Sequence, residues 1–186
     1  MDQLTWLNKP DFSSLRDGVL NLVTSEGGDF WRDTFYGFRH DNGHAKLGAT
    51  EASFSCEVTF TADYQAQYDQ AGLMLRADAA HWIKAGVEFV NGTAWLACVV
   101  TTEKSDWSQM PLPGFTGTLS LRLTRVGDAV WVQYRLEEGW QMFRLAFFPP
   151  DLAVQAGPMA CSPSRSGLNV TFRDFYLGPP RADKPY

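Results

Sequence analysis

The chain has 186 residues, of which 45% are apolar and 14% aromatic, so it is long enough for one domain with a sizeable core. Its formal charge of −5 offers no basic surface for phosphates, and no run approaches the roughly 18 apolar residues that a membrane helix needs, which argues against nucleic-acid and membrane partners. The start of the chain lacks the basic and then apolar order of a secretory signal, so the sequence predicts a cytoplasmic protein.

Strand patterns follow one another along the chain, and no window shows apolar residues at helical spacing over three turns. We expect strands at residues 19–24, 52–61, 70–77, 82–90, 95–103, 118–125, 129–137, 140–148 and 168–177. Hairpin turns are predicted where residues tolerant of positive φ interrupt the pattern, at Asp41-Asn42-Gly43, Asn91-Gly92, Gly127-Asp128 and Glu138-Gly139. Residues 109–117 and 149–165 are rich in Pro, Gly and Ser and are predicted to be longer connections between sheets.

This succession of strands predicts an all-β fold, a two-sheet antiparallel β-sandwich. One domain is expected over residues 1–177, with residues 178–186 as a loosely ordered C-terminal tail. Cys56 and Cys98 alternate with apolar residues and are predicted to be small core residues. With Cys161 they form an odd set without the paired spacing of a zinc or redox motif.

Two neighbouring strands, residues 70–77 and 82–90, carry the most distinctive polar pattern. Successive side chains on a strand point to opposite faces, so one face of each strand is apolar and the other is polar or small. A short turn near residues 78–80 would lay the two polar faces side by side. The residues expected on this shared face are Gln70, Gly72, Arg76, Trp82, Lys84, Gly86 and Glu88.

This face has two interpretations. Planar polar groups beside a Trp, with glycines leaving room above the sheet, suit a flat polar ligand such as a saccharide. Gln70, Arg76, Lys84 and Glu88 would then form the hydrogen-bonding floor of the site, and Trp82 and Trp107 its walls. Alternatively, the charges form a solvated outer face held by cross-strand ion pairs.

Aromatic residues also gather in two predicted loops. Residues 29–36 combine rings with carboxylates, and Trp107 follows Ser105-Asp106. Exposed loop Trp residues often contact ligands, but they equally serve to close the open end of a sandwich.

A metal site is conceivable at the predicted turn, where His40 and His44 flank Asp41. The alternative is that the Asn-Gly pair simply makes a hairpin loop, since no fourth ligand follows in the sequence. We therefore predict no metal and no other cofactor, because phosphate-loop and dinucleotide patterns are also missing from the sequence.

Catalysis requires a tighter pattern than the strands offer. Retaining glycosidases place two carboxyl groups about 5–5.5 Å apart, and no strand provides two acids on one face, since Glu88 stands alone on its own. Arg76 and Lys84 beside Glu88 would also hold this carboxyl ionised.

Several blocks together resemble a known family, the small concanavalin A-like proteins of unknown function of the regulation-of-enolase type. They are residues 68–76 (YDQAGLMLR), 81–88 (HWIKAGVE), 99–101 (VVT) and 105–107 (SDW), with 29–31 (DFW) and 41–44 (DNGH) upstream. The resemblance implies a jelly roll of two curved sheets whose concave face can hold a saccharide, as in lectins and glucanases of this fold. This chain lacks the alternating Glu, Asp and Glu of the glucanase catalytic strand, so the shared fold by itself does not imply hydrolase activity.

Three functions follow as hypotheses. The first is a non-catalytic module that binds a carbohydrate or related polar metabolite on the concave face. The second is an interaction protein that regulates a metabolic enzyme, with a protein partner on the same face or on the aromatic loops. The third is a glycoside hydrolase that uses Glu88 with Asp33 or Asp106.

Overall fold

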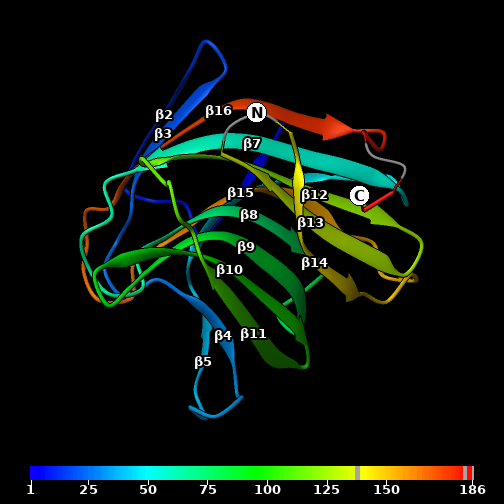
Figure 1. Cartoon of the computed structure of the whole chain (residues 1–186), viewed down its shortest axis with the longest axis horizontal. Coiled ribbons are helices and arrows are strands. Elements are labelled where there is room, and N and C mark those ends of the chain that lie inside the picture. The colour runs from blue at the N-terminus through cyan, green and yellow to red at the C-terminus, as the bar shows by residue number, and fades with distance from the viewer. Residues whose placement is uncertain (137–138, 182–183, 186) are drawn as a thin grey trace.

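The structure is a computed structural model that describes residues 1–136, 139–181 and 184–185. Two seven-stranded antiparallel sheets pack face to face, and a separate two-stranded hairpin lies below one of them (Figure 1). The predicted all-β sandwich is therefore confirmed. Among the described residues, no helix is long and apolar enough to cross a membrane.

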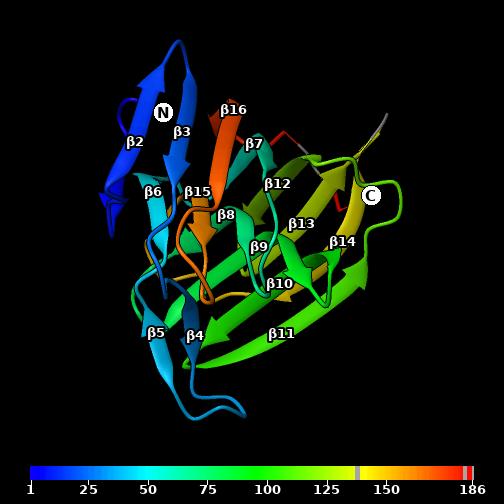
Figure 2. The same ribbon diagram turned by 90° about the vertical axis from the view of Figure 1, so that its left-hand side faces the viewer.

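The two sheets have a different strand order from that of the chain. Sheet A contains, in spatial order, β1 (Thr5–Leu7), β6 (His44–Ala49), β15 (Gln155–Cys161), β8 (Gln70–Arg76), β9 (His81–Val90), β10 (Thr93–Thr102) and β11 (Lys104–Pro111). Sheet B contains β14 (Gln141–Phe147), β13 (Ala129–Arg135), β12 (Thr118–Val126), β7 (Phe54–Ala62), β16 (Asn169–Gly178), β3 (Val19–Val23) and β2 (Phe12–Arg16). The hairpin consists of β4 (Phe30–Arg32) and β5 (Arg39–Asp41). Figure 2 shows this hairpin below sheet A and the β2–β3 pair at the opposite end.

The main core lies between the sheets, because alternate residues of each strand turn inward. Leu73 and Ile83 from sheet A and Phe60 and Leu121 from sheet B are fully buried there. The predicted core positions of Cys56 and Cys98 are confirmed. Burial raises the pKa of the Cys98 thiol to about 12 and that of Cys56 further, so both thiols stay protonated.

Two of the predicted hairpin turns are confirmed. Asn91 and Gly92 join β9 to β10 with φ of 51° and 77°, as a turn with two positive φ angles requires. Gly127-Asp128 joins β12 to β13. The turn predicted at Glu138-Gly139 falls partly on residues 137–138, which lie outside the described residues.

The predicted hairpin at residues 41–43 is wrong. The strand before it, β5, pairs with β4, whereas the strand after it, β6, pairs with β1 and β15, so the chain passes here from the hairpin into sheet A. A Cβ on Gly43 would approach the Phe30 ring and Cys161 Sγ to less than 3 Å. Glycine is therefore required at residue 43 by close packing, not by a two-residue turn.

Two predicted connections also contain strands. Residues 104–111 form β11, and residues 155–161 form β15 between β6 and β8 despite a Gly and a Pro. The pairing of β15 with β6 skips residues 157 and 158, which accommodates the missing N–H of Pro158. Tertiary pairing on both sides therefore overrides the local preference of this segment.

The end of the chain lies against sheet B. The Arg181 backbone N–H donates to Ser55 Oγ at 2.9 Å, and the Pro185 carbonyl accepts a hydrogen bond from Gln133 Nε2 at 3.0 Å. The domain boundary at residue 177 and the loose order of the tail stay predictions.

Candidate functional site

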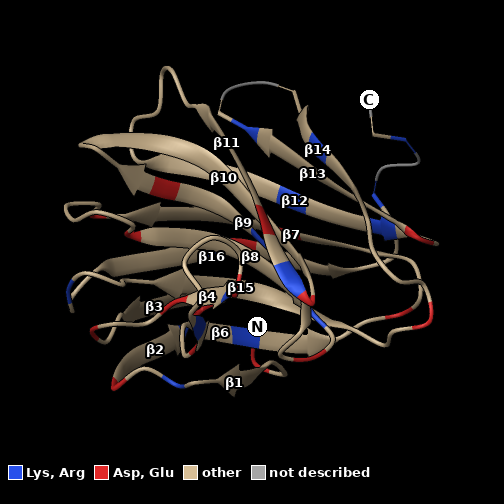
Figure 3. Ribbon diagram, turned by 90° about the horizontal axis from the view of Figure 1, so that it is seen from below, with Lys and Arg blue, Asp and Glu red and all other residues tan. Residues whose placement is uncertain are grey.

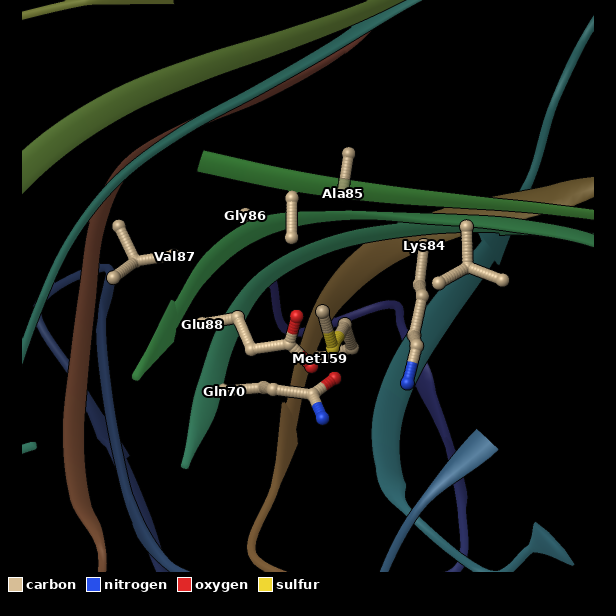
Figure 4. Close-up of a pocket in the computed structure, with 9 residues that line it drawn as sticks. Gln70, Lys84, Ala85, Gly86, Val87, Glu88 and Met159 are labelled. Carbon is tan, nitrogen blue, oxygen red and sulfur yellow. The ribbon is translucent and has the colours of Figure 1, made fainter. Parts of the chain in front are cut away.

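The predicted parity of β8 and β9 is confirmed by their register. Gln70 pairs with Glu88, Met74 with Lys84, and Arg76 with Trp82, so these side chains share the face of sheet A that points away from sheet B. The strands of sheet A curve, and this face lies on their concave side (Figure 1). Figure 4 shows Gln70, Lys84 and Glu88 on the concave side and Ala85 on the opposite side.

Two glycines face each other across β8 and β9 on this surface. A Cβ on Gly72 would clash with the Ala85 carbonyl, and a Cβ on Gly86 would clash with that of Ala71. The two strands therefore approach too closely for any other residue. Gly86 also lines a small recess of about 10 Å³, about the room that one water needs.

The β4–β5 hairpin covers part of the concave face and lines, together with it, a cavity of about 300 Å³ that is partly open to solvent. This volume is at the lower end of the range for ligand pockets, which suits a small ligand. The side chains around it that sequence reasoning singled out are Gln70, Lys84, Glu88 and Trp107. The other lining residues are Gly27, Asp29, Trp31, Tyr36, Phe38, His40, Tyr68, Val99 and Pro163.

Trp82 and Arg76, both expected in the site, lie elsewhere. Trp82 is 1% exposed and packs in a second apolar cluster with Phe30, at 6.1 Å between ring centroids. Arg76 donates two hydrogen bonds to the Asp41 carboxylate, at 2.7 and 2.8 Å. The alternation of side chains predicted the correct face for both residues. The hairpin covers that end of the face, however, and both side chains contact it: Arg76 binds Asp41, and Trp82 packs on Phe30.

Lys84 is held by the hairpin as well. Its Nζ lies 2.7 Å from Asp29 Oδ1, and its side chain is almost fully buried. Burial by itself lowers the pKa of Lys84, but the opposing attraction of Asp29 and weaker contributions from Cys161 and Glu88 raise it overall, so the ammonium stays charged. Asp29 Oδ1 also accepts the Phe30 backbone N–H at 2.8 Å, which orients the carboxylate.

Glu88 is a buried carboxyl in the cavity that has no ion-pair partner among the described residues. It is 6% exposed, and its Oε2 is buried without a hydrogen-bond partner in the described part of the chain. Burial raises its pKa from 4.5 to about 7. The positive charge of Lys84 lowers this pKa, and the negative charge of Asp29 raises it. The nearby Trp107 N–H lowers it slightly, although it is not positioned to form a hydrogen bond. The expectation that Arg76 and Lys84 hold Glu88 ionised is therefore wrong, because Arg76 faces Asp41 and Lys84 is bound to Asp29.

Gln70 and Trp107 complete the polar lining. Gln70 is buried beside Glu88, and its amide makes no side-chain hydrogen bond to the residues that the structure describes. Trp107 was predicted to lie in a loop, but it lies on strand β11 opposite Val99. Its Nε1 is buried without a partner among the same residues. A buried acceptor of Glu88 and the buried donor of Trp107 at the floor of the cavity thus lack partners among the described residues.

Aromatic rings from the hairpin form the outer wall. Trp31 packs edge-on against Trp107 at 6.4 Å and against Tyr36 at 5.5 Å, and Tyr36 stacks on Phe38 at 5.3 Å. Sequence reasoning noticed that residues 29–36 are rich in rings and carboxylates but did not assign them to the site. Only the folding of the hairpin against sheet A shows that Asp29, Trp31 and Tyr36 of this segment line the cavity together with Glu88.

The residues considered for a metal are separated by the structure. His44 Nε2 accepts the Ser25 N–H at 3.0 Å, and its Nδ1 donates to the Asn8 carbonyl at 2.6 Å. Asp41 is bound to Arg76, and only His40 lines the cavity. Within the described residues no group of three His, Cys, Asp or Glu side chains is arranged to hold a metal ion.

The acids considered as partners of Glu88 in hydrolysis are also elsewhere. Asp33 forms a two-pronged ion pair with Arg39 near the hairpin tip, and Asp106 lies 3.2 Å from Arg144 of sheet B. Neither lines the cavity. The second carboxyl there is Asp29, which Lys84 already holds.

Charges elsewhere on the molecule are mixed. Figure 3 shows acidic and basic residues interspersed over the strands and loops. The cavity therefore stands out by its desolvated charges, not by a strong field from the surrounding surface.

Known proteins resemble this chain over most of its length. Regulation of enolase protein 1 of Saccharomyces cerevisiae is 42% identical over 181 residues, which cover 97% of this chain and 91% of the yeast protein. The crystal structure of a functionally unknown protein from Saccharomyces cerevisiae superposes with a TM-score of 0.94 and 42% identity, over 97% of this chain and 98% of the other. The carbohydrate-binding module CBM66 of Bacillus subtilis shares the fold, with a TM-score of 0.63 and 13% identity over 94% of this chain and 96% of the module.

These matches agree with the resemblance noted in the sequence. The family model for DUF1349, described as a protein of unknown function, matches residues 6–180. The chain therefore belongs to the DUF1349 family.

Proposed function

We propose that this protein binds a small carbohydrate, or a related polyhydroxylated metabolite, in the cavity between sheet A and the β4–β5 hairpin, without catalysing a reaction. The observation that carries the proposal is the buried Glu88 Oε2, which lacks a partner in the described structure and faces an aromatic-walled cavity. Leaving such a group unpaired costs free energy, which a ligand hydroxyl donating to it would recover.

The rest of the cavity fits the same ligand class. The Gln70 amide and Trp107 N–H can bond further hydroxyl groups, and the rings of Trp31 and Tyr36 offer apolar surface to the C–H face of a sugar. A purely apolar ligand would leave these polar groups unpaired. Binding without turnover follows from the carboxyl groups, because Lys84 holds Asp29 and leaves Glu88 without the second free acid that glycosidases use.

The proposal is tested by calorimetric titration with a panel of mono- and disaccharides. At least one should bind, and Glu88→Gln and Trp107→Phe should each weaken it about tenfold, the effect of losing one hydrogen bond to a buried polar group. Glu51→Gln and Trp6→Phe remove the same groups away from the cavity and should leave affinity unchanged. A panel without binding at millimolar concentrations would contradict the proposal.

A second candidate is regulation of an enzyme through direct contact. The observation that favours it is the hairpin tip, where Phe35 is 92% exposed beside the half-exposed Tyr36 and Phe38. The name of the yeast relative points to enolase as the enzyme to test. Purified enolase should bind the immobilised protein, and Phe35→Ser should weaken this binding at least tenfold, as expected for an exposed aromatic anchor. Equal binding by the variant, or none by either protein, would count against this candidate.

A further inference from the structure

The cavity contains one carboxylate without a cation of its own. The Lys84 ammonium lies 2.7 Å from Asp29 Oδ1, and no salt bridge to Glu88 occurs within the described residues. When all three groups are ionised, Asp29 and Lys84 cancel and Glu88 leaves one unbalanced negative charge. Buried charges in proteins are normally paired, so Glu88 must either take up a proton or receive a positive group from elsewhere.

A neutral hydroxyl satisfies only part of this need. It can donate a hydrogen bond to Glu88 Oε2, but the excess negative charge stays in a poorly solvated place. A protonated amine at the same position supplies both the donor and the missing charge, and a quaternary ammonium supplies the missing charge. Lys84 does not repel it at full strength, because its own charge is compensated by Asp29 in direct contact.

The walls of the cavity suit a cation as well. Trp31, Tyr36, Phe38, Tyr68 and Trp107 all line it. The face of an aromatic ring is negative, so a cation within about 6 Å of it is attracted, and rings grouped around one cavity are typical of sites for organic ammonium groups. The aromatic rings and the Glu88 carboxylate therefore both favour a positively charged ligand group.

We infer that the ligand of this cavity carries a protonated or quaternary amine, which sits between the Glu88 carboxylate and the aromatic wall. This inference rests on the proposed function for the ligand's place in the cavity and narrows its class from neutral sugars to amino sugars and related amino alcohols. Nothing else in the proposed function changes: Gln70 and the Trp107 N–H bind the hydroxyl groups of the same ligand.

Two matched pairs of probes separate charge from shape. Choline is compared with its neutral isostere 3,3-dimethylbutan-1-ol, and D-glucosamine with D-glucose, by calorimetric titration at pH 7. In each pair the cation should bind about tenfold more tightly, the difference expected for a desolvated cation among aromatic rings. In Glu88→Gln this preference should fall to about twofold, since the rings remain but the carboxylate is lost.

A second variant tests the inference independently in case Glu88→Gln does not fold. Tyr36→Leu keeps an apolar contact at a half-exposed position but removes one ring face, so it should lower the preference for choline over its isostere. Thermal unfolding of both variants serves as the control for folding.

The outcomes distinguish the inference from the proposed function. Equal affinity for the members of both pairs, or a preference that persists unchanged in Glu88→Gln, overturns the inference. Binding of D-glucose that depends on Glu88 without any preference for the amine overturns it as well and supports the proposed function. A Glu88-dependent preference for choline supports the inference even if no sugar binds. Lack of binding by both amines at millimolar concentrations overturns it.

Discussion

Replacing Gly86 by Ala is expected to destabilise the protein by about 3 kcal/mol. The new Cβ would clash with the Ala71 carbonyl of the neighbouring strand, a backbone atom that cannot rotate away. Because β8 and β9 lie in the middle of sheet A, relieving the clash requires β8 and β9 to separate, which disturbs the core below them and the cavity above. Urea unfolding at one pH measures the change.

Gly28→Ala is the matched control for this prediction. Gly28 also has ordinary backbone geometry, but a Cβ there would meet the Asn42 carbonyl at 3.4 Å, an ordinary contact. We expect a change of less than about 0.5 kcal/mol for it. If Gly86→Ala were as mild as Gly28→Ala, the close approach of β8 and β9 would not be needed for stability.

Glu88→Gln is expected to stabilise the ligand-free protein above pH 7, although it should weaken ligand binding. The rise of the Glu88 pKa from 4.5 to about 7 corresponds to roughly 3 kcal/mol, an upper bound for the cost of its negative charge in the folded state. Gln is neutral and of similar shape, so part of this cost is removed. We expect a gain of roughly 1–3 kcal/mol in the free energy of unfolding, since the buried amide still lacks some partners.

The effect should depend on pH in one direction. Below pH 4.5 Glu88 is protonated in both the folded and the unfolded chain, and the variant should equal the wild type. Between pH 4.5 and 7 the unfolded chain loses this proton and the folded protein keeps it, so the stability of the wild type falls relative to the variant. Above pH 7 the folded protein loses it too, and the difference becomes constant.

Urea unfolding of both proteins across this pH range tests the prediction. Glu51→Gln removes an exposed carboxyl and should retain the pH dependence of the wild type. A Glu88→Gln curve that runs parallel to the wild type at every pH would show that the Glu88 charge has no cost in the folded state. The need for a ligand to compensate that charge would then disappear, along with the physical basis of the site.

A substitution that stabilises the free protein and weakens ligand binding is expected where a residue is placed to meet a ligand. Residues placed for function are often unfavourable for the free protein, because their partners arrive only with the ligand. Glu88 meets this description, whereas Arg76 and Lys84 do not, since Asp41 and Asp29 already satisfy them. The structure therefore divides the predicted polar floor into groups that hold the hairpin and groups that face the cavity.

The amino-acid sequence alone determined the sandwich and the sidedness of β8 and β9. Alternation with a period of two is a local property, so it places Gln70, Lys84 and Glu88 on one face whatever packs above them. Turn residues such as Asn91-Gly92 are equally local, because their φ angles follow from the residues themselves.

Only the tertiary structure decided what covers that face. β15 and β11 form because neighbouring strands pair with them, and the β4–β5 hairpin lies over sheet A because Asp29 and Asp41 meet Lys84 and Arg76 across long stretches of chain. These contacts join residues 35 or more positions apart in the sequence. The alternation of residues along a strand cannot predict contacts between such distant positions. For that reason the sequence predicted Glu88 as a carboxylate held ionised by Arg76 and Lys84, while in the folded protein it is a buried carboxyl with a raised pKa that lines an aromatic-walled cavity.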